Sequence, residues 1–475
     1  MVFASPLFLF IFLPITMIFY FMLPRKLKNF WLMLVSVAFY SWGGGNYALI
    51  ILVSIIFNYI IGIQIGRYKK GNIKRKLWLI IGLILNFSVL GYFKYFNFFI
   101  DNLVKLGGVF QPGFTISTET ILLPVGISFF TFQIVSYVID VYREDVEPQK
   151  NIVNLALYIL LFPQLIAGPI VRYIDVEKQI NDRKITLDKF NYGVKRFIVG
   201  FSKKVLISNT AGFIADYIFN NHGLYNDMSL TWIGVICYAL QIYHDFSGYS
   251  DMAIGLGKMF GFDFLENFDY PYISKSIKEF WRRWHISLST WFRDYLYIPL
   301  GGSRIGKFAT YRNLLIVFFA TGLWHGASWN FIIWGLFYGV FLILERGVFG
   351  KILERIPSIL QRFYTLLIVL IGWVFFRAEN LSLAISFIKG MFSFNFNSFY
   401  LIYNVIDSQA ITFLICGIVF STPIAKVIGR YISEKIKVFQ NGFKFIYDLG
   451  LIAVFFISIL YMTGSFYNPF IYFRF

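Results

Sequence analysis

Apolar and polar positions along the chain separate into long uncharged runs and short basic clusters, a pattern typical of a protein that crosses a membrane several times. Residues 1–24 contain no charged side chain, and Arg25, Lys26 and Lys28 follow directly. No basic region precedes this first run, which argues against a cleaved signal peptide. Because Lys and Arg collect on the cytoplasmic side, we expect the N-terminus to be extracytoplasmic.

A second uncharged run covers residues 29–66 and ends at another basic cluster that begins with Arg67. As one straight helix this run would be about 57 Å long, nearly twice the thickness of the hydrocarbon core. Both ends of the run are basic, so both should face the cytoplasm. We therefore predict a helical hairpin that turns at Gly43-Gly44-Gly45-Asn46.

The rest of the chain repeats this alternation without a loop long enough to form a separate soluble domain. The further apolar stretches are 77–100, 121–141, 152–171, 191–220, 229–260, 313–344, 360–376, 409–428 and 446–465. Several of them are interrupted by Pro or Lys, which is tolerated where the backbone is buried in protein. We predict an all-α polytopic membrane protein in one domain, residues 1–475, with about ten to twelve transmembrane or re-entrant helices.

Composition excludes other classes of protein. The 475 residues are 58% hydrophobic, 21% aromatic and only 14% charged, which fits neither an ordinary soluble domain nor a disordered chain. The net charge of +18 is explained by basic cytoplasmic loops and gives no reason to expect a nucleic-acid partner. Cys237 and Cys416 lie in apolar stretches, so neither a disulfide framework nor a cysteine metal site is expected.

The densest polar region is 275–312, where eight basic and two acidic residues give a net charge of +6. Projected on a helix, residues 279–295 place four polar side chains in one stripe: Arg282, His285, Ser289 and Arg293. The opposing face holds Trp281, Trp284, Leu288, Trp291 and Tyr295. Two interpretations remain open: a helix at the membrane interface, or a cytoplasmic vestibule for an anionic substrate.

His325 is the most informative single residue. It lies in the stretch 313–344, which contains no Asp, Glu, Lys or Arg. A histidine inside a spanning segment is costly and marks a functional site. On a continuous helix Thr321, His325 and Ser328 would share one face, and the two hydroxyls could orient the imidazole.

The other histidines are weaker candidates. His222 lies in a predicted loop. His244 lies in a polar run with Asp245 and Asp251, whose carboxylates need partners inside a membrane. We expect those partners to be the arginines of the region 275–312. No spacing of ligands predicts a metal site, and no motif of a serine hydrolase, a P-loop protein or a zincin occurs.

Several motifs resemble those of the membrane-bound O-acyltransferases, and within that family those of the alginate O-acetyltransferase group, which includes peptidoglycan O-acetyltransferases. The matching segments are 123–129 (LPVGISF), 162–169 (FPQLIAGP), 245–253 (DFSGYSDMA), 279–296 (from EFWRRWHISLSTW to RDYL), 322–327 (GLWHGA), 376–380 (FRAEN) and the closing 469–475 (PFIYFRF). The resemblance extends over essentially the whole chain.

This resemblance implies a fold of tilted helices around a central tunnel in the bacterial cytoplasmic membrane. It implies acetyl transfer from cytoplasmic acetyl-CoA, with no bound cofactor, toward an envelope polysaccharide such as an alginate-like exopolysaccharide or peptidoglycan. The family's catalytic histidine corresponds to His325 and its second histidine to His285. The expected partner is a periplasmic SGNH-type acetyltransferase. His244 departs from the alginate-type pattern, so an obligatory role for it is not expected.

The chemistry leaves several hypotheses open. His325 would act as a general base on an acceptor hydroxyl or form an acetyl-histidine, with His285 orienting the reactants, supported by Trp284 and Ser289. The arginines Arg282, Arg283 and Arg293 would hold CoA phosphates or pair with Asp245 and Asp251. Two alternative functions are D-alanyl transfer to teichoic acid on the same fold and a polysaccharide exporter without covalent chemistry.

Overall fold

A computed structural model describes residues 1–435, 440–464 and 467–471. Over these ranges the chain forms helices, turns and loops and contains no β-strand, as the predicted all-α class requires. The last residue of the predicted stretch 446–465 and residues 472–475 of the closing motif lie outside the described residues. The described chain divides into two compact units, which we consider separately.

The first unit comprises Met1–Phe190, Gly257–Leu265 and Gly326–Ser328. Its helices are η1 (Phe8–Phe12), α1 (Leu13–Met22), α2 (Arg25–Gly44), η2 (Gly45–Tyr47), α3 (Ala48–Arg67), α4 (Ile73–Leu90), η3 (Gly91–Tyr95), α5 (Phe96–Phe110), α6 (Ile127–Arg143), α7 (Ile152–Leu160), α8 (Phe162–Leu165) and α9 (Tyr173–Asn181).

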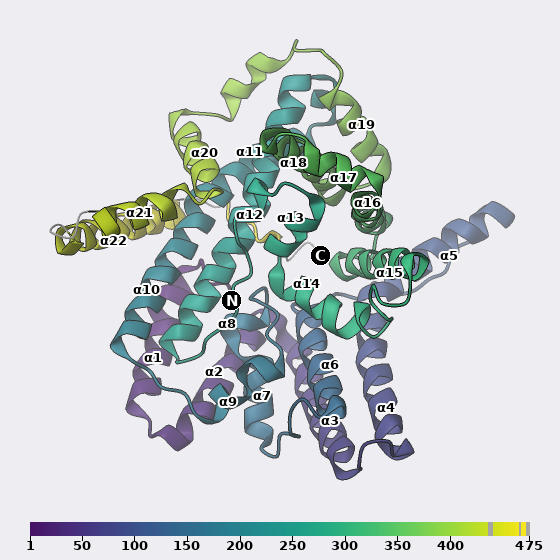
Figure 1. Cartoon of the computed structure of the whole chain (residues 1–475), viewed down its shortest axis with the longest axis vertical. Coiled ribbons are helices and arrows are strands. Elements are labelled where there is room, and N and C mark those ends of the chain that lie inside the picture. Colours follow the sequence, from purple (N-terminus) through teal and green to yellow (C-terminus); the bar gives the residue numbers. More distant parts are fainter. Residues whose placement is uncertain (436–439, 465–466, 472–475) are drawn as a thin grey trace. The chain divides into compact units, whose positions relative to one another are not determined.

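The predicted hairpin over residues 29–66 is confirmed. Helix α2 ends at Gly44, a single turn of 3₁₀ helix follows, and α3 begins at Ala48. Gly45 adopts φ +50°, a conformation that glycine reaches without steric cost. Helices α3, α4 and α6 then run side by side (Figure 1). Between α3 and α4 the buried amides of Asn58 and Asn86 bond to each other at 2.8 and 3.1 Å, which satisfies both polar groups in an apolar setting.

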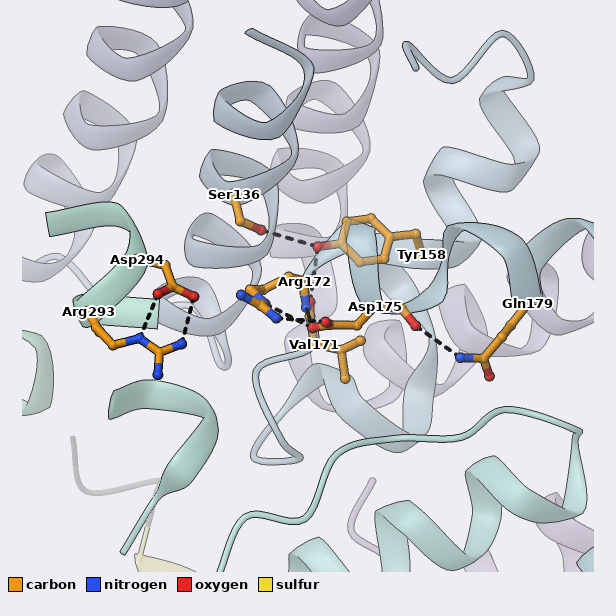
Figure 2. Close-up of polar contacts among 8 residues, drawn as sticks. All are labelled: Ser136, Tyr158, Val171, Arg172, Asp175, Gln179, Arg293 and Asp294. Carbon is orange, nitrogen blue, oxygen red and sulfur yellow. Dashed lines mark hydrogen bonds and ion pairs between the residues drawn. The ribbon is translucent and has the colours of Figure 1, made fainter. Parts of the chain in front are cut away.

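Helix α9 is fixed at its start by a cluster of polar contacts (Figure 2). The backbone N–H of Arg172 donates to Asp175 Oδ2 at 3.1 Å, and its guanidinium donates to both oxygens of the same carboxylate. The buried Tyr158 hydroxyl donates to the carbonyl of Val171 at 3.0 Å. A carboxylate in the first turn of a helix also suits the helix dipole. These contacts set the direction of α9 and therefore the position of the loop after Asn181.

The second unit comprises Asn191–Leu256, Glu266–His325 and Trp329–Phe475. Its helices are α10 (Leu187–Ser202, after its first four residues), η4 (Lys203–Ser208), α11 (Asn209–Asn220), η5 (His222–Asn226), α12 (Met228–Met259, before its last three residues), η6 (Pro271–Ile273), α13 (Ile277–Arg283), α14 (Ile286–Phe292), η7 (Arg293–Tyr297), α15 (Lys307–His325), α16 (Trp329–Arg346), α17 (Val348–Arg355), α18 (Ser358–Arg377), α19 (Leu381–Met391), η8 (Phe399–Asn404), α20 (Ser408–Phe420), α21 (Ile424–Lys435) and α22 (Gln440–Gly464).

The uncharged stretch 313–344 forms two helices, α15 and α16, packed closely against each other (Figure 1). Glycines make this approach possible: a Cβ on Gly335 would lie 3.1 Å from the Cα of Gly322. Gly322 and Gly335 thus let α15 and α16 pack backbone to backbone, as small residues do between membrane helices.

Within the described residues, five helical segments are long and apolar enough to cross a membrane: Ala48–Arg67, Ile73–Phe110, Trp329–Arg346, Ser358–Arg377 and Lys444–Gly464. Shorter apolar helices cover Phe8–Met22, Leu381–Met391 and Ser408–Phe420. The chain is therefore a multi-pass membrane protein. The total of ten to twelve segments stays a prediction from hydropathy.

Candidate active site

His325 is the last residue of α15 and is buried, with 5% of its surface exposed. Three aromatic rings meet its imidazole edge to face: Trp324 at 4.9 Å, Trp334 at 4.8 Å and Phe376 at 5.1 Å between ring centroids. These rings come from α15, α16 and α18. Helices α15, α16 and α18 therefore surround the imidazole with aromatic rings.

The predicted helical face of Thr321, His325 and Ser328 is wrong, because α15 ends at His325. Gly326 follows the helix end, the position where glycine is most favoured. Ser328 lies past this end in Gly326–Ser328, which belongs to the first unit. The Thr321 hydroxyl donates to the carbonyl of Val317 at 2.8 Å, so it bonds to its own helix and does not orient the imidazole.

The predicted continuous helix over 279–295 is also wrong. Helix α13 ends at Arg283, α14 begins at Ile286, and His285 between them has φ +45°, in the left-handed region. Such a conformation is costly for a residue other than glycine and persists only where the surroundings enforce it. The stripe of Arg282, His285, Ser289 and Arg293 therefore does not exist as one helical face.

Asn267 enforces the conformation at His285. Its backbone carbonyl accepts from the N–H of Ile286 at 2.9 Å. Its side-chain oxygen Oδ1 accepts from the N–H of Ser287 at 3.1 Å and from the Ser287 hydroxyl at 2.9 Å, and lies 3.2 Å from Nδ1 of His285. An amide oxygen can only accept, so Nδ1 of the neutral ring holds the proton and Nε2 keeps a free lone pair. The geometry leaves His285 a potential base at Nε2.

Burial keeps His285 neutral. The residue is 1% exposed, and this desolvation lowers its pKa to about 3. Its ring packs against Phe246 at 4.5 Å and against Trp324 at 5.8 Å. Trp324 also contacts His325, so the two histidines predicted from the sequence meet the same indole. The tertiary structure thus brings His285 and His325 into one aromatic site.

The predicted aromatic face of the region 275–312 is confirmed as buried, although the helix itself is broken. Trp281, Trp284, Leu288, Trp291 and Tyr295 are each at most 9% exposed. Trp284 stacks near Phe280 at 5.6 Å and contacts Trp373 at 4.9 Å. The Ser289 hydroxyl donates to the carbonyl of Trp281 at 3.1 Å, which ties α14 to α13. Trp284 and Ser289 therefore support the scaffold on which His285 sits.

The three predicted arginines differ in what they bind. The Arg283 guanidinium pairs with Glu279 at 2.9 Å and with Asp269 at 2.8 Å, so its charge is already used. Arg293 pairs with the adjacent Asp294 at 2.7 Å but stays 59% exposed (Figure 2). Arg282 is exposed. Arg282 and Arg293 are therefore exposed, whereas Arg283 pairs with two carboxylates.

The expectation that these arginines pair with Asp245 and Asp251 is wrong. Both aspartates lie on α12 and are buried. Asp245 pairs with Lys204 at 2.8 Å and accepts from the backbone N–H of Ile471 at 2.9 Å. Asp251 pairs with Arg196 at 2.6 Å and with Lys203 at 2.7 Å. The partners come from α10 and η4 because Gly200 and Gly248 leave no room for a Cβ and let these helices approach.

The remaining histidines have structural surroundings. His244 is fully buried, and its Nε2 lies 2.9 Å from the carbonyl of Gly417 and 3.2 Å from the Ser421 hydroxyl. His222 is exposed at the start of η5, as expected for a loop residue. In the part of the chain that the structure describes, no three His, Cys, Asp or Glu side chains are grouped as metal ligands.

Reasoning from the sequence missed Asn267, Arg196 and the lysines Lys203 and Lys204. No periodicity distinguishes Asn267, which acts by contacts with residues 18 to 20 positions away. A signal existed for the two lysines: they interrupt the apolar stretch 191–220, and such charges need partners. Because Asp245 and Asp251 also need partners inside the membrane, the sequence could have predicted that these lysines pair with these aspartates.

The sequence that forms this site is similar to known proteins. The model of the membrane-bound O-acyltransferase family, MBOAT, matches residues 143–377, which include both histidines of the site. The chain is 47% identical over 395 residues to "Probable alginate O-acetylase AlgI" of Pseudomonas aeruginosa, covering 83% of this chain and 75% of that protein. It is 37% identical over 430 residues to "Peptidoglycan O-acetyltransferase" of Helicobacter pylori, covering 83% and 80%.

A more distant similarity relates the chain to "Teichoic acid D-alanyltransferase" of Bacillus subtilis. The identity is 29% over 277 residues, which cover 53% of this chain and 66% of that protein. The three names refer to acyl transfer with alginate, peptidoglycan or teichoic acid.

Proposed function

We propose that this chain, which belongs to the membrane-bound O-acyltransferase family and is an acyltransferase, moves an acetyl group from cytoplasmic acetyl-CoA toward a polysaccharide of the cell envelope. The observation that supports this most is His325, a buried imidazole held among Trp324, Trp334 and Phe376. Because the chain belongs to a family of acyltransferases, the alternative of a polysaccharide exporter without covalent chemistry is set aside.

In the proposed reaction His325 is the general base. A hydroxyl of the acceptor attacks the thioester carbonyl as His325 removes its proton. The new C–O ester bond forms, the C–S bond breaks, and the proton passes to the departing CoA sulfur. In a second route, consistent with the same geometry, an imidazole nitrogen attacks first and an acetyl-histidine then transfers to the acceptor. Both routes need a neutral imidazole and a site that excludes water, because water would hydrolyse the thioester.

His285 is proposed to position the reactants or to relay a proton through Nε2. Its own orientation depends on Asn267, and its contact with Trp324 links it to the ring that also contacts His325. Arg282 and Arg293 are proposed to attract the CoA phosphates, since both guanidinium groups are exposed and phosphate is a favoured partner of arginine. Arg283 is not included in this proposal, because it already pairs with two carboxylates.

The acceptor is proposed from the relatives. The names of the Pseudomonas aeruginosa and Helicobacter pylori proteins support an alginate-like polysaccharide or peptidoglycan. Both polymers lie outside the cytoplasm, which supports a place for the chain in the bacterial cytoplasmic membrane. The basic residues Arg25, Lys26 and Lys28 after the first uncharged run support an extracytoplasmic N-terminus. A periplasmic SGNH-type acetyltransferase is the proposed partner that completes delivery.

The test is acetyl transfer in membranes that contain the full chain as wild type or His325→Gln. Label from [¹⁴C-acetyl]-CoA is followed into the polysaccharide fraction. We expect the variant to lose transfer by a factor of about a hundred to ten thousand. The matched control is His222→Gln, an exposed histidine in the same chain, which should retain transfer. Unchanged transfer by His325→Gln at equal protein level would remove His325 from the mechanism.

The donor needs its own test, because the Bacillus subtilis relative is named for D-alanyl transfer. Purified protein is given acetyl-CoA or a D-alanyl thioester on a small acidic carrier protein. The proposal expects consumption of acetyl-CoA and release of CoA thiol only with the first donor. Turnover of the carrier thioester alone would assign the chain to D-alanyl transfer instead.

A further inference from the structure

A cavity in the first unit combines positive charge with apolar walls. Its volume is about 640 Å³, and it is lined by the end of α1, the start of α2 and a set of residues from a later segment: Ile180, Asn181, Arg183, Ile185, Thr186, Leu187 and Phe190. Among the described residues, the lining contains three cationic side chains, Arg25, Lys28 and Arg183, and no carboxylate. A cluster of like charges around a cavity is unfavourable unless something neutralises it.

Arg183 is held in place entirely by neutral acceptors. Its Nε donates to the Tyr20 hydroxyl at 3.1 Å and to the carbonyl of Phe260 at 3.0 Å. Its Nη1 donates to Asn29 Oδ1 at 2.7 Å. The face of the guanidinium lies 4.5 Å from the ring of Phe262. These contacts fix the group but leave its charge unpaired, and Nη2 is buried without an acceptor among the residues that the structure describes.

Lys28 shows the same lack of neutralisation. Its ammonium lies 4.8 Å from the Tyr20 ring centroid and 5.7 Å from that of Phe21, and its contacts in the described chain include no carboxylate. Burial lowers the pKa of Lys28, and the nearby charge of Arg183 lowers it further. Two cations that destabilise each other would both be stabilised by one anion between them.

The acid near this cluster is already engaged. Asp182 is exposed and pairs with Arg25, so it offsets one of the three charges. A different arrangement occurs at Asp263, where one carboxylate pairs with both Lys189 and Lys258. Arg183 and Lys28 therefore line the cavity without a carboxylate partner among the described residues.

We propose that this cavity binds the phosphate group of a phosphate ester, with Arg183 and Lys28 as the main cationic contacts and Arg25 in support. Phosphate offers several oxygens to donors that converge from different segments, and guanidinium and ammonium groups are its usual partners. The apolar walls suit a ligand with an apolar portion beside the phosphate: Phe21 is 45% exposed and Leu187 is 86% exposed. Two sources share this chemistry, an anionic phospholipid headgroup and CoA. In the second case the inference rests on the proposed function.

The test measures binding to full-length protein in neutral detergent by microscale thermophoresis. The probes are dioctanoyl phosphatidylglycerol, CoA, and zwitterionic dioctanoyl phosphatidylcholine as a reference for apolar binding. We expect Lys28→Gln to weaken binding of one anionic probe by at least about tenfold, the effect of losing one charge-assisted contact. Arg183→Gln should weaken it at least as much. The control is Lys26→Gln, which removes the same charge from an exposed residue outside the lining, and should change affinity less than about twofold.

The pattern of losses identifies the source. Loss of phosphatidylglycerol binding alone assigns a lipid headgroup, and loss of CoA binding alone assigns the donor. If Lys28→Gln and Lys26→Gln bind both anionic probes as the wild type does, the proposal is overturned, even if Arg183→Gln fails to fold. His325→Gln should bind the probes normally, so a failure of the proposed acetyl transfer and a failure of this inference are distinguishable.

Discussion

The aromatic site of the second unit and the cavity of the first unit differ in the charge of the side chains that line them. Around His325 and His285 the described ring contacts are with Phe and Trp, and burial keeps His285 neutral. Around Arg183 and Lys28 the walls hold cations without a carboxylate. This difference is what the two proposed roles require, because proton transfer needs neutral bases in a dry site, whereas recognition of an anion needs fixed positive charge.

The buried charges of the second unit sharpen this contrast. Asp251 has two cationic partners and Asp245 has Lys204, so these carboxylates are neutralised within the chain. Arg183, in contrast, is fixed by uncharged groups. Satisfied pairs indicate a structural role, and an unsatisfied cation at a cavity indicates a ligand.

The largest expected effect separates the two regions by function. His325→Gln should reduce acetyl transfer about a hundredfold or more while leaving the affinity for the anionic probe unchanged. Lys28→Gln should weaken probe binding about tenfold and leave single-turnover acetyl transfer at saturating donor near the wild-type rate. Parallel assays of both quantities on both variants test the division. A loss of transfer and binding together in either variant would break the comparison.

The next effect concerns stability. Asp251→Ala leaves Lys203 and Arg196 without their buried partner, and we expect it to destabilise the fold by about 3–5 kcal/mol. Glu266→Gln, which removes an exposed partner of the same Arg196, should cost no more than about 1 kcal/mol. Thermal aggregation in detergent, monitored by size-exclusion chromatography, ranks the variants. If Asp251→Ala and Glu266→Gln lower the aggregation temperature equally, the ion pairs of Asp251 do not stabilise the fold more than an exposed pair does.

Asn267 gives an intermediate effect as a positioning residue for His285. Asn267→Ala should lower kcat about tenfold with little change in KM, because the donor site is intact but the imidazole is no longer oriented. Asn267→Asp keeps the acceptor atom and should retain more activity. Its carboxylate would raise the pKa of His285 above about 3, so the acid limb of the pH–rate profile should move to higher pH. If both variants keep the wild-type pH profile and kcat, His285 has no part in turnover.

The smallest expected effect is an increase in affinity for the anionic probe. Asp182→Asn releases Arg25 from its exposed pair, and we expect it to tighten binding of the anionic probe about two- to fivefold. Asp188→Asn removes the same charge from an exposed residue that lies outside the lining, and should change affinity less. The thermophoresis assay resolves such a difference, and a larger gain for Asp188→Asn would argue for a diffuse electrostatic effect instead of a site.

Much of the fold could be predicted because it depends on local patterns. The turn at Gly43–Asn46 follows from the length of an uncharged run between basic clusters, and the buried aromatic face of 281–295 follows from spacing along the chain. The two errors in helical geometry, at 279–295 and at Ser328, share one cause, an assumption of continuous helix. Backbone contacts from Asn267 bend the chain at His285, and α15 ends before Ser328, neither of which helical periodicity can report.

By itself the sequence determined the class of protein and its family, and it made His325 the leading candidate residue, because hydropathy, charge and short motifs are properties of neighbouring positions. Only the tertiary structure decided which charges are neutralised. Arg183 meets Tyr20 across 163 positions and Asp251 meets Lys203 across 48, and such partners are chosen by helix packing. Whether a buried charge is a structural pair or a ligand site depends on that choice, since desolvation penalises a charge and only a partner in space offsets the penalty.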